Sequence, residues 1–315
     1  MHCKIKSIIF SLSWIVILAV AVSSFAQQNK RIIPNKADTV VGIGLQSTLG
    51  EQKRSAIVEA DGYAFFSEDK TIRQLREEAI ANAKRVALEQ AQTYVKSFTQ
   101  VENFVLRYDL VQSEAEGYLR ILQSKDYGVQ PDYRYRYWIK AEIEYALKES
   151  EAETKPASLF QNANTPLTVQ VWTEKAAYTE GEEMHVFLEA NKNFYARVIY
   201  VDSQGNIVQL LPNLYRSTNH FMGSKIYQIP DPAQGDQFQL RVKSPFGPEE
   251  IIVYASTTSQ DSLPLDEAGD GLYRYRGSKQ ELNMKARGIK VVESQNSIRA
   301  AEFYQATWNV LTQKK

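Results

Sequence analysis

The longest periodic pattern in the chain runs from Thr71 to Phe98. Apolar residues recur there in steps of three and four, which places them on one face of an α-helix, while most charged residues fall on other faces. No Gly or Pro interrupts the pattern, and Ser67–Thr71 offers polar side chains that can cap its start. The apolar positions are Ile72, Leu75, Ala79, Ala83, Val86, Ala87, Ala91, Tyr94, Val95 and Phe98. We predict one long amphipathic helix, whose apolar face must pack against another element.

A strict alternation of residue types follows in residues 133–145. One set is Tyr133, Tyr135, Tyr137, Ile139, Ala141, Ile143 and Tyr145, and the other is Arg134, Arg136, Trp138, Lys140, Glu142 and Glu144. A period of two predicts a strand with the first set buried and the second set in water. Residues 57–66 and 118–126 are its predicted companion strands, with a turn at 128–132. These elements predict an α+β domain over residues 38–147, in which the long helix packs on an antiparallel sheet.

The pattern changes after residue 147. Residues 148–165 are rich in Glu, Ser, Lys, Ala, Asn and Pro and predict a linker. Short alternating runs separated by polar turns then fill residues 166–313, which predicts an all-β sandwich domain. The expected strands are 167–172, 184–189, 196–201, 207–211, 238–242, 251–255, 288–292 and 304–311.

The N-terminus has the three-part layout of a secretory signal. Lys4 and Lys6 precede an uncharged, mostly apolar run, and small residues at Ser24 and Ala26 predict cleavage between Ala26 and Gln27. The alternative is an uncleaved membrane anchor over residues 8–26, which would be the chain's only contact with a membrane. Either alternative predicts export to the periplasm or the cell envelope.

Composition narrows the chemistry that is open to the exported part. Cys3 leaves with the signal, so no cysteine remains for a disulfide, a thiolate nucleophile or a zinc site. Without Lys4 and Lys6 the chain has 35 basic and 37 acidic side chains, which argues against nucleic acid as a partner. The 18 tyrosines suit half-buried strands and binding faces equally.

None of the candidate chemical motifs is complete. His185 and His220 are isolated, and neither has the carboxylate spacing of a metal site. Ser67–Lys70 has the Ser-x-x-Lys form without the companion motifs of penicillin-binding enzymes, and Gly42–Gly44 lacks a third glycine and a following helix pattern. Asp266–Gly271 is acidic but lacks calcium-loop spacing. We therefore predict no catalytic residue, no cofactor and no metal site.

Two similar aromatic–basic stretches are the candidate contact sites. In the first, Arg134, Arg136 and Trp138 fall on the polar face of the predicted strand, and exposed Arg and Trp side chains are frequent anchors at protein interfaces. In the second, Tyr273 and Tyr275 alternate with Arg274 and Arg276. The alternative for both is an ordinary sheet surface with Arg stacked on neighbouring rings.

Part of the first domain resembles a known family. The residues that carry the similarity are Glu59-Ala-Asp-Gly-Tyr-Ala-Phe65, the run Ala79–Ala91, and Glu116-Gly-Tyr-Leu119. They resemble the N-terminal domain of flagellar assembly protein T and related envelope lipoproteins, which implies an assembly or scaffolding domain without chemistry. The chain departs from the lipoproteins because it has no cysteine at its predicted cleavage site.

The second domain resembles the bacterial domain of unknown function 4384. The similarity lies in five segments in the same order: Tyr178-x-x-Gly181-Glu182, Tyr200–Gly205, Leu210-Leu-Pro-Asn213, Pro245-Phe-Gly247 and Ile251–Ser256. Domains of this family often accompany catalytic or signalling domains, so the resemblance implies an accessory module that binds.

Three functions follow from these patterns. The first is a non-catalytic binding or assembly module for other envelope proteins, with affinity from aromatic and Arg anchors. The second is recognition of a cell-wall or surface glycan by tyrosine-rich faces. The third is a hydrolase with dispersed carboxylates, for which no set of nucleophile, base and orienting group is visible.

Overall fold

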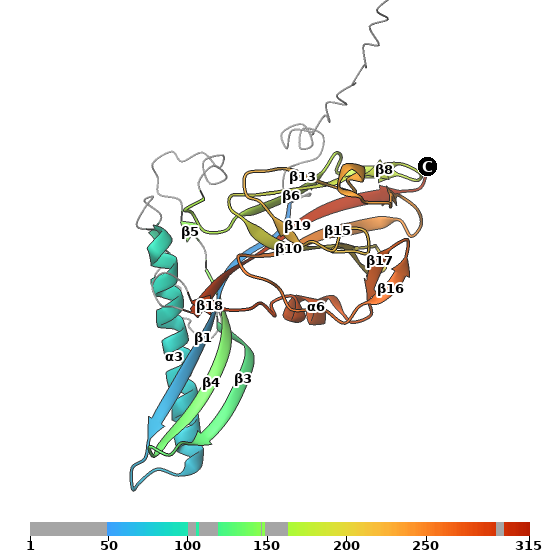
Figure 1. Cartoon of the computed structure of the whole chain (residues 1–315). Coiled ribbons are helices and arrows are strands. Elements are labelled where there is room, and N and C mark those ends of the chain that lie inside the picture. Colours follow the sequence, from blue (N-terminus) through green and yellow to red (C-terminus); the bar gives the residue numbers. More distant parts are fainter. Residues whose placement is uncertain (1–48, 100–104, 107–118, 146, 149–162, 294–298) are drawn as a thin grey trace, which may run out of the picture. The chain divides into compact units, whose positions relative to one another are not determined.

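The computed structural model describes residues 49–99, 105–106, 119–145, 147–148, 163–293 and 299–315. The predicted signal segment with Ala26 and Gln27, the Gly42–Gly44 run and most of the predicted linker lie outside these residues. The described part is mostly antiparallel β structure, with one long helix packed on a large curled sheet. Figure 1 shows this helix, α3, alongside the strands β1, β4 and β3.

A twelve-stranded sheet contains most of the strands. Its main order is β16-β17-β11-β10-β15-β19-β1-β4-β3, with β12, β18 and β7 paired to its side. Their bounds are β1 Leu49–Phe65, β3 Leu119–Val129, β4 Arg134–Glu144, β7 Ala177–Thr179, β10 Phe194–Val201, β11 Ile207–Leu211, β12 His220–Phe221, β15 Gly247–Ser256, β16 Asp266–Gly269, β17 Leu272–Tyr275, β18 Val292–Glu293 and β19 Arg299–Gln313.

The remaining elements are shorter. A second sheet has the order β13-β9-β6, and β14 with β8 and β2 with β5 form two further pairs. Their bounds are β2 Val105–Leu106, β5 Leu147–Lys148, β6 Val169–Thr173, β8 Glu183–Met184, β9 Val186–Ala190, β13 Tyr227–Ile229 and β14 Leu240–Arg241. The helices are α3 Ile72–Thr99, η2 Pro232–Gln234 and α6 Lys279–Lys285.

The predicted fold class is confirmed only in its coarser form, as mostly antiparallel β structure with one long helix packed on a sheet, and the structure does not divide clearly into two separate domains. The C-terminal strand β19 pairs along its length with β15 of the predicted sandwich, and it also pairs with β1 of the predicted α+β domain. Ile57 lies opposite Ala301 in this second pairing. The backbone hydrogen bonds of one sheet therefore run through both regions, and the two are not clearly separate (Figure 1). Periodicity alone does not show this, because the two strands are far apart in sequence.

The predicted helix over 71–98 is confirmed as α3, and its start is capped as expected. The Thr71 hydroxyl accepts a hydrogen bond from the Gln74 amide at 3.3 Å, while the Gln74 side chain accepts one from the Thr71 amide at 2.8 Å. The buried face carries alanines at every fourth position, namely Ala79, Ala83, Ala87 and Ala91. These small side chains allow the helix to lie very close to β1.

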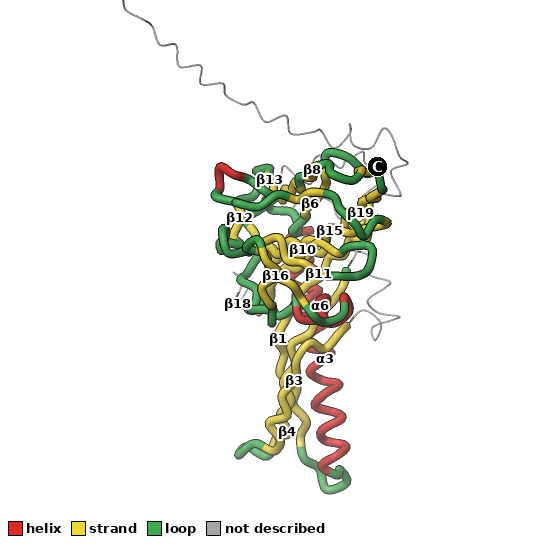
Figure 2. The backbone as a smooth tube through the Cα atoms, turned by 90° about the vertical axis from the view of Figure 1, so that its right-hand side faces the viewer, coloured by secondary structure: helices red, strands yellow, loops and turns green. Residues whose placement is uncertain are grey.

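Gly62 of β1 marks the closest point of this contact. A Cβ atom at Gly62 would lie 2.0 Å from the Ala79 carbonyl oxygen and 2.3 Å from the Ala83 nitrogen. Both of these atoms belong to the helix backbone, which a side-chain rotation does not move. The alanine face of α3 therefore packs directly on the backbone of β1 at Gly62. Figure 2 shows α3 running alongside these strands.

Two cores share one face of the long sheet. Along β19, Ala300 belongs to the core beneath α3, while Tyr304, Ala306 and Trp308 belong to the core that faces β6, β9 and β13. Glu302 lies between these positions and is 2% exposed. It accepts a hydrogen bond from the Leu167 amide and pairs with the Lys192 ammonium at 3.0 Å. A buried carboxylate with its own partners thus separates the two cores.

The opposite face is covered by α6 and the residues that follow it. Leu282, Ala286 and Ile289 pack there against Ile57 and Phe303. This segment also covers two polar side chains of β4 that the alternation predicted to be exposed, so that prediction was wrong for them.

Lys140 and Glu142 are 5% and 1% exposed, although the alternation places them in water. The Arg287 Nε donates to Glu142 Oε1 at 2.6 Å, and the Lys140 ammonium donates to the Ile289 carbonyl. Burial lowers the pKa of Lys140, because the charged ammonium is disfavoured away from water. The polar face of β4 is therefore buried at Lys140 and Glu142 and partly exposed at its start and at Glu144.

Candidate interaction surface

The outer half of β1 extends beyond its pairing with β19. That pairing ends where Val58 lies opposite Ala300, whereas β1 stays paired with β4 as far as Phe65, opposite Arg134. From Glu59 outward, three strands of the long sheet remain, β1, β4 and β3, with α3 on one face. The other face is the candidate interaction surface. We call it the open face and define it as Asp61, Tyr63, Lys125, Tyr127, Arg134, Arg136 and Trp138.

The predicted contact residues of β4 lie side by side on the open face. Arg134, Arg136 and Trp138 are all half-buried and alternate with Tyr135 and Tyr137, which are buried against α3. This separation follows the predicted period of two. Tyr133 departs from it, because it lies in the turn before β4 with a φ of 59° and is 77% exposed.

Each arginine of the open face has an acidic and an aromatic neighbour. Arg136 donates to both carboxylate oxygens of Asp61, at 2.8 and 3.2 Å, and its guanidinium carbon lies 4.4 Å from the Tyr127 ring centroid. Arg134 pairs with Asp132, and its guanidinium lies 4.5 Å from the Tyr63 ring centroid. These contacts hold the guanidinium planes in defined positions.

The electrostatics of the open face follow from these pairs. The hydrogen bond from Arg134 lowers the pKa of Asp132, and the hydrogen bond to Asp61 raises the pKa of Arg136. Lys125 adds a further cation, 4.5 Å from the Tyr127 ring centroid. Trp138 lies opposite Asp61 on one neighbouring strand and opposite Lys125 on the other. The face therefore combines aromatic rings with three cations, two of which are paired with carboxylates.

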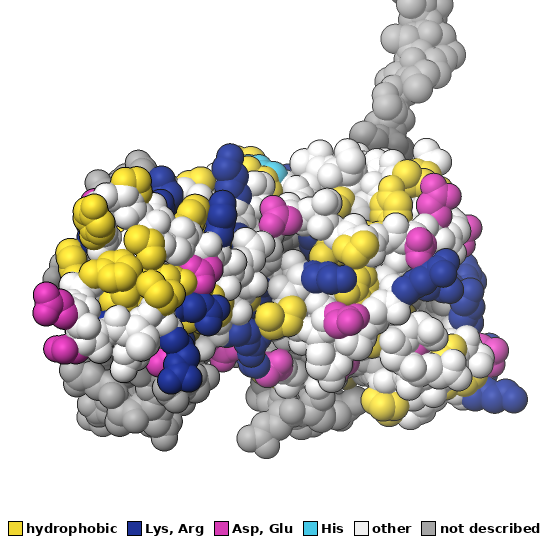
Figure 3. Space-filling model, turned by 90° about the horizontal axis from the view of Figure 1, so that it is seen from below, with side chains coloured by type: hydrophobic (Ala, Val, Ile, Leu, Met, Phe, Trp, Pro, Cys, Tyr) yellow, Lys and Arg dark blue, Asp and Glu magenta, His cyan; other side chains and the backbone are white. Residues whose placement is uncertain are grey.

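Exposed apolar side chains gather at the end of this region. Six of the thirteen large hydrophobic residues that are exposed in the described part belong to the β1 end, the α3 start and the β3–β4 turn. They are Phe65 at 65%, Phe66 at 40%, Ile72 at 53%, Tyr127 at 38%, Val129 at 48% and Tyr133 at 77% exposure. We call these six residues the apolar tip. Figure 3 shows hydrophobic side chains clustered there, at the left of the view.

Strand pairing places three members of the apolar tip at the same end of the sheet. Phe65 lies opposite Arg134, the residue after Tyr133, and Val129 lies opposite Tyr135. The turn between the strands is closed by the Gln130 amide, which donates to the Arg134 carbonyl at 2.7 Å. Sequence reasoning placed Ile72 and Tyr133 on buried faces, which was wrong, and it did not single out the other four residues. The available signal was the Phe65-Phe66 pair at the end of a strand pattern, just before a polar turn.

The edge of the sheet is a poorer contact site than its face. Strand β3 is at the end of the strand order and pairs with β4 on one side only. Its register shifts twice, between Ile121 and Gln123 and between Asp126 and Gly128, and Lys125 lies between the shifts. Bulges and lysines on an edge strand disfavour the addition of another strand. The open face and the apolar tip remain the better candidates.

The second aromatic–basic stretch lies elsewhere. It forms β17, which is separated from β4 by five strands in the order of the sheet. Tyr275 is only 4% exposed, and Tyr273 is half-buried opposite Gln209. Arg276 pairs with Asp266 at 2.5 Å. The structure thus does not bring the two stretches together, and the Tyr275 side chain is not part of an open sheet surface.

The other sequence candidates have local partners. His185 Nδ1 lies 2.5 Å from Glu174 Oε1, and His220 lies against the Tyr195 ring at a centroid distance of 4.8 Å. Lys70 pairs with Glu78 rather than with Ser67. In the described part of the chain, no group of three or more potential ligand residues is arranged to hold a metal ion. No helix in that part is both long and apolar enough to cross a bilayer.

Comparison with known families identifies one segment of the chain. Residues 177–259 match a domain of unknown function, DUF4384, which is about a quarter of the sequence. The matched segment runs from β7 to just beyond β15. The comparisons provide no evidence for the resemblance of residues 38–147 to flagellar assembly protein T. No curated protein matches the chain.

The residues that carry the DUF4384 resemblance build turns. Gly181 has a φ of 87°, and its amide donates to the Val242 carbonyl at 2.9 Å. The Asn213 side chain is buried and accepts hydrogen bonds from the amides of Tyr215 and Arg216 at 2.8 and 2.7 Å. These roles specify a backbone path and do not form a binding site. The match therefore describes part of the fold, and the open face lies outside it.

Proposed function

We propose that this protein is an exported bacterial envelope protein that acts as a non-catalytic binding or assembly module for other envelope proteins. The surface that carries the interaction is the open face together with the apolar tip. The apolar tip is the observation on which the proposal depends. Clustered exposed aromatic and aliphatic side chains at one end of a protein are typical of a contact site, because leaving them in water is unfavourable.

The anchors on this surface are already held in place before a partner binds. Arg136 is fixed by two hydrogen bonds to Asp61 and by the Tyr127 ring. A side chain that is already ordered loses less conformational entropy when it becomes buried in an interface. Phe65 and Tyr133 next to these arginines provide the apolar area that a hot spot needs.

A protein partner suits this surface better than a glycan. A sugar stacks on the face of an aromatic ring, but cations already lie over the rings of Tyr63 and Tyr127. A sugar on either ring would have to displace an arginine or a lysine. Co-sedimentation with purified peptidoglycan that is lost in Trp138→Ala would support the glycan alternative against our proposal.

Site-specific photo-crosslinking in intact cells tests the proposed function. A photoreactive amino acid placed at Tyr133 should yield one discrete crosslinked protein in the cell envelope. With that partner purified, Phe65→Ser should weaken binding by about tenfold or more, as expected for a hot-spot residue. Leu214→Ser is the matched control, since Leu214 is 58% exposed but belongs to a different part of the structure. Equal losses in the two variants, or no crosslink at Tyr133, would contradict the proposal.

The predicted export has its own test. N-terminal sequencing of the mature protein should begin at Gln27, and cell fractionation should recover it from the periplasm or envelope. A cytoplasmic protein that starts at Met1 would contradict this part of the proposal.

A further inference from the structure

A β-bulge in β3 places Tyr127 on the open face. Asp126 lies opposite Tyr137 and Gly128 lies opposite Arg136, which leaves Tyr127 as the extra residue between two paired positions. Gly128 has a φ of 66°, in the left-handed region that glycine adopts most readily. The guanidinium carbon of Arg136 lies 4.4 Å from the Tyr127 ring centroid. The contacts that hold this bulge therefore also determine where the Tyr127 ring lies.

One carboxylate connects the bulge to two other elements. Asp126 Oδ1 accepts a hydrogen bond from the Gly128 amide at 2.9 Å. Asp126 Oδ2 accepts two more, from Arg76 Nε at 2.8 Å and from the Tyr135 hydroxyl at 2.9 Å. The three donors belong to the bulge, to α3 and to β4. Asp126 therefore fixes the bend of β3 relative to the helix and to the neighbouring strand.

The three donors favour the charged form of this carboxylate. Burial raises the pKa of Asp126, but the hydrogen bonds from Arg76, Tyr135 and Gly128 lower it by more, so the pKa lies below its ordinary value. The Arg76 guanidinium is itself held 5.7 Å from the Tyr137 ring centroid. A charged acceptor with several ordered donors keeps its geometry better than a pair of exposed side chains does.

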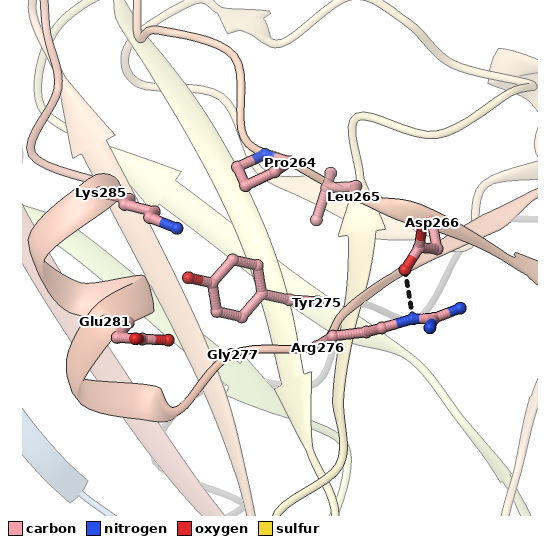
Figure 4. Close-up of a pocket in the computed structure, with 8 residues that line it drawn as sticks. All are labelled: Pro264, Leu265, Asp266, Tyr275, Arg276, Gly277, Glu281 and Lys285. Atoms are coloured by element: carbon pink, nitrogen blue, oxygen red, sulfur yellow. Dashed lines mark ion pairs between the residues drawn. The ribbon is translucent and has the colours of Figure 1, made fainter.

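Asp266 provides the contrasting case of an exposed carboxylate. It pairs with the Arg276 guanidinium at 2.5 Å beside a small cavity that Tyr275 also lines, and Figure 4 shows this pair pointing away from the rest of the cavity. The two side chains are 52% and 80% exposed. Strand β16, which begins at Asp266, is at the opposite end of the strand order from β3. Substitution of Asp266 therefore removes an aspartate without touching the bulge.

The position of the Tyr127 ring affects the rest of the open face. The ring lies against Arg136, which in turn donates two hydrogen bonds to Asp61 on the next strand. The Asp126 carboxylate is directed toward α3, on the other side of the sheet from these groups. We propose that Asp126 is a positioning residue of the interaction surface, which holds Tyr127 and Arg136 in the geometry that the partner protein binds. This inference rests on the function proposed for the open face.

NMR of the free mature protein tests the positioning step without a partner. The measurements are the nuclear Overhauser contacts between the Tyr127 ring and the Arg136 side chain, and the hydrogen-exchange rate of the Gly128 amide. Asp126→Ala should remove these contacts and speed the exchange. Asp126→Asn should preserve both, because asparagine keeps an oxygen that accepts from the Gly128 amide and forms the same turn. Asp266→Ala should change neither.

Binding to the partner that is crosslinked at Tyr133 tests the consequence. Asp126→Ala should weaken binding by about two- to tenfold, the loss expected when one or two anchor side chains are no longer ordered in advance. Asp126→Asn and Asp266→Ala should bind nearly as well as the wild type. Gly128→Ala should weaken binding as Asp126→Ala does, because a φ of 66° is strained for a residue with a side chain, although the added Cβ would meet open space among the described residues.

Comparison of the two Asp126 variants separates positioning from stability. Both lose the charged pair with Arg76 and should have similar thermal midpoints, so equal losses of binding in both would show a purely structural role and overturn the proposal. Overhauser contacts that persist in Asp126→Ala would also overturn it, as would contacts that disappear while binding is unchanged, and the proposed function would then stand. If the wild type yields no partner at Tyr133, the proposed function fails, and the NMR comparison still decides whether Asp126 holds the Tyr127 ring.

Discussion

The helix-covered and the strand-covered parts of the long sheet form their cores from side chains of different size. Beneath α3, most of the buried residues are alanines, and a bare glycine in β1 touches the helix backbone. Between the long sheet and β6, β9 and β13, the core contains large side chains, including Trp172, Phe187, Phe194, Tyr304 and Trp308. The first core depends on close approach of two backbones, and the second depends on interlocking of bulky groups.

This difference determines which changes each part tolerates. A core of alanines has little side-chain freedom with which to absorb an added group, so an insertion must move the helix. A core of large side chains adjusts through rotamers when a residue is exchanged for one of equal volume. The two parts are also joined on the opposite face by the buried pair Glu142–Arg287, whose members are 145 residues apart in sequence.

The largest effect is expected where the two parts are joined. Arg287→Met removes the nearer guanidinium partner of the buried Glu142 carboxylate and leaves only Arg120 at 3.6 Å, which should lower the free energy of unfolding by up to about 3–5 kcal/mol. Denaturant unfolding monitored by circular dichroism measures this loss. The double variant Glu142→Gln with Arg287→Met should recover much of it, because no charge then stays buried alone.

A matched ion pair at the surface is the control for this prediction. Arg276→Met removes a partner of Asp266 in a pair whose arginine side chain is 80% exposed. Exposed pairs contribute about 0–1 kcal/mol, so this variant should be nearly neutral. Equal effects of Arg276→Met and Arg287→Met would mean that burial of the Glu142 pair does not matter.

The alanine stripe provides the next largest effect. Ala83→Leu adds volume at a fully buried position beside Gly62 and should lower the free energy of unfolding by about 1–3 kcal/mol. Ala81→Leu makes the same change on the exposed side of α3, where the expected effect lies within about 0.5 kcal/mol. Chemical denaturation of both variants tests this, and Ala83→Leu should have the lower midpoint. Similar values would show that the helix does not rest on β1 as closely as described.

The strand-covered core should tolerate a change of shape at constant volume. Leu188 of β9 is fully buried, and Leu188→Met should cost less than about 1.5 kcal/mol of unfolding free energy. Calorimetric midpoints measured beside those of Ala83→Leu place both cores on one scale. A larger loss for Leu188→Met than for Ala83→Leu would reverse the comparison.

The smallest effect on stability is expected at Glu249, a buried carboxylate in β15. Burial raises its pKa, and the charge of Asp202 acts in the same direction, against hydrogen bonds donated by the hydroxyls of Tyr200 and Thr312. The folded state therefore holds this proton to a higher pH than the unfolded chain does. Stability consequently falls as pH rises from the unfolded pKa through the folded pKa.

Glu249→Gln should remove this contribution. The variant should have a slightly higher thermal midpoint than the wild type at neutral pH and little difference at acidic pH, below the ordinary carboxyl pKa. Thermal melts across this pH range test the sign. A variant that is less stable than the wild type at neutral pH would show that the charged carboxylate is favoured by its hydrogen bonds.

Local sequence patterns predicted helices and strands well where a single packed element determines which side chains are buried. The three-and-four spacing of residues 71–98 predicted α3, because packing on a sheet requires one apolar face. Alternation predicted that Tyr135, Tyr137 and Ile139 are buried. It was wrong for Lys140 and Glu142, since residues around Arg287 cover them from a distant part of the chain.

The candidate surface was predictable in part for the same reason. Arg134, Arg136 and Trp138 share a face because a strand repeats every two residues. The apolar tip was not predicted, because its members come from the end of β1, the start of α3 and the β3–β4 turn. Tyr275 looks like Tyr135 in sequence, yet it lines a cavity that α6 completes.

The sequence by itself determined which side chains had to leave water, where the long helix begins and where polar turns interrupt the strands. Only the tertiary structure decided that β19 joins β1 to β15, that Glu142 meets Arg287, and that two aromatic–basic stretches of similar sequence have different surroundings. Periodicity records the direction in which a side chain points, and this is a local property of the backbone. The group that it meets there depends on pairings between distant segments, which the free energy of the whole fold selects.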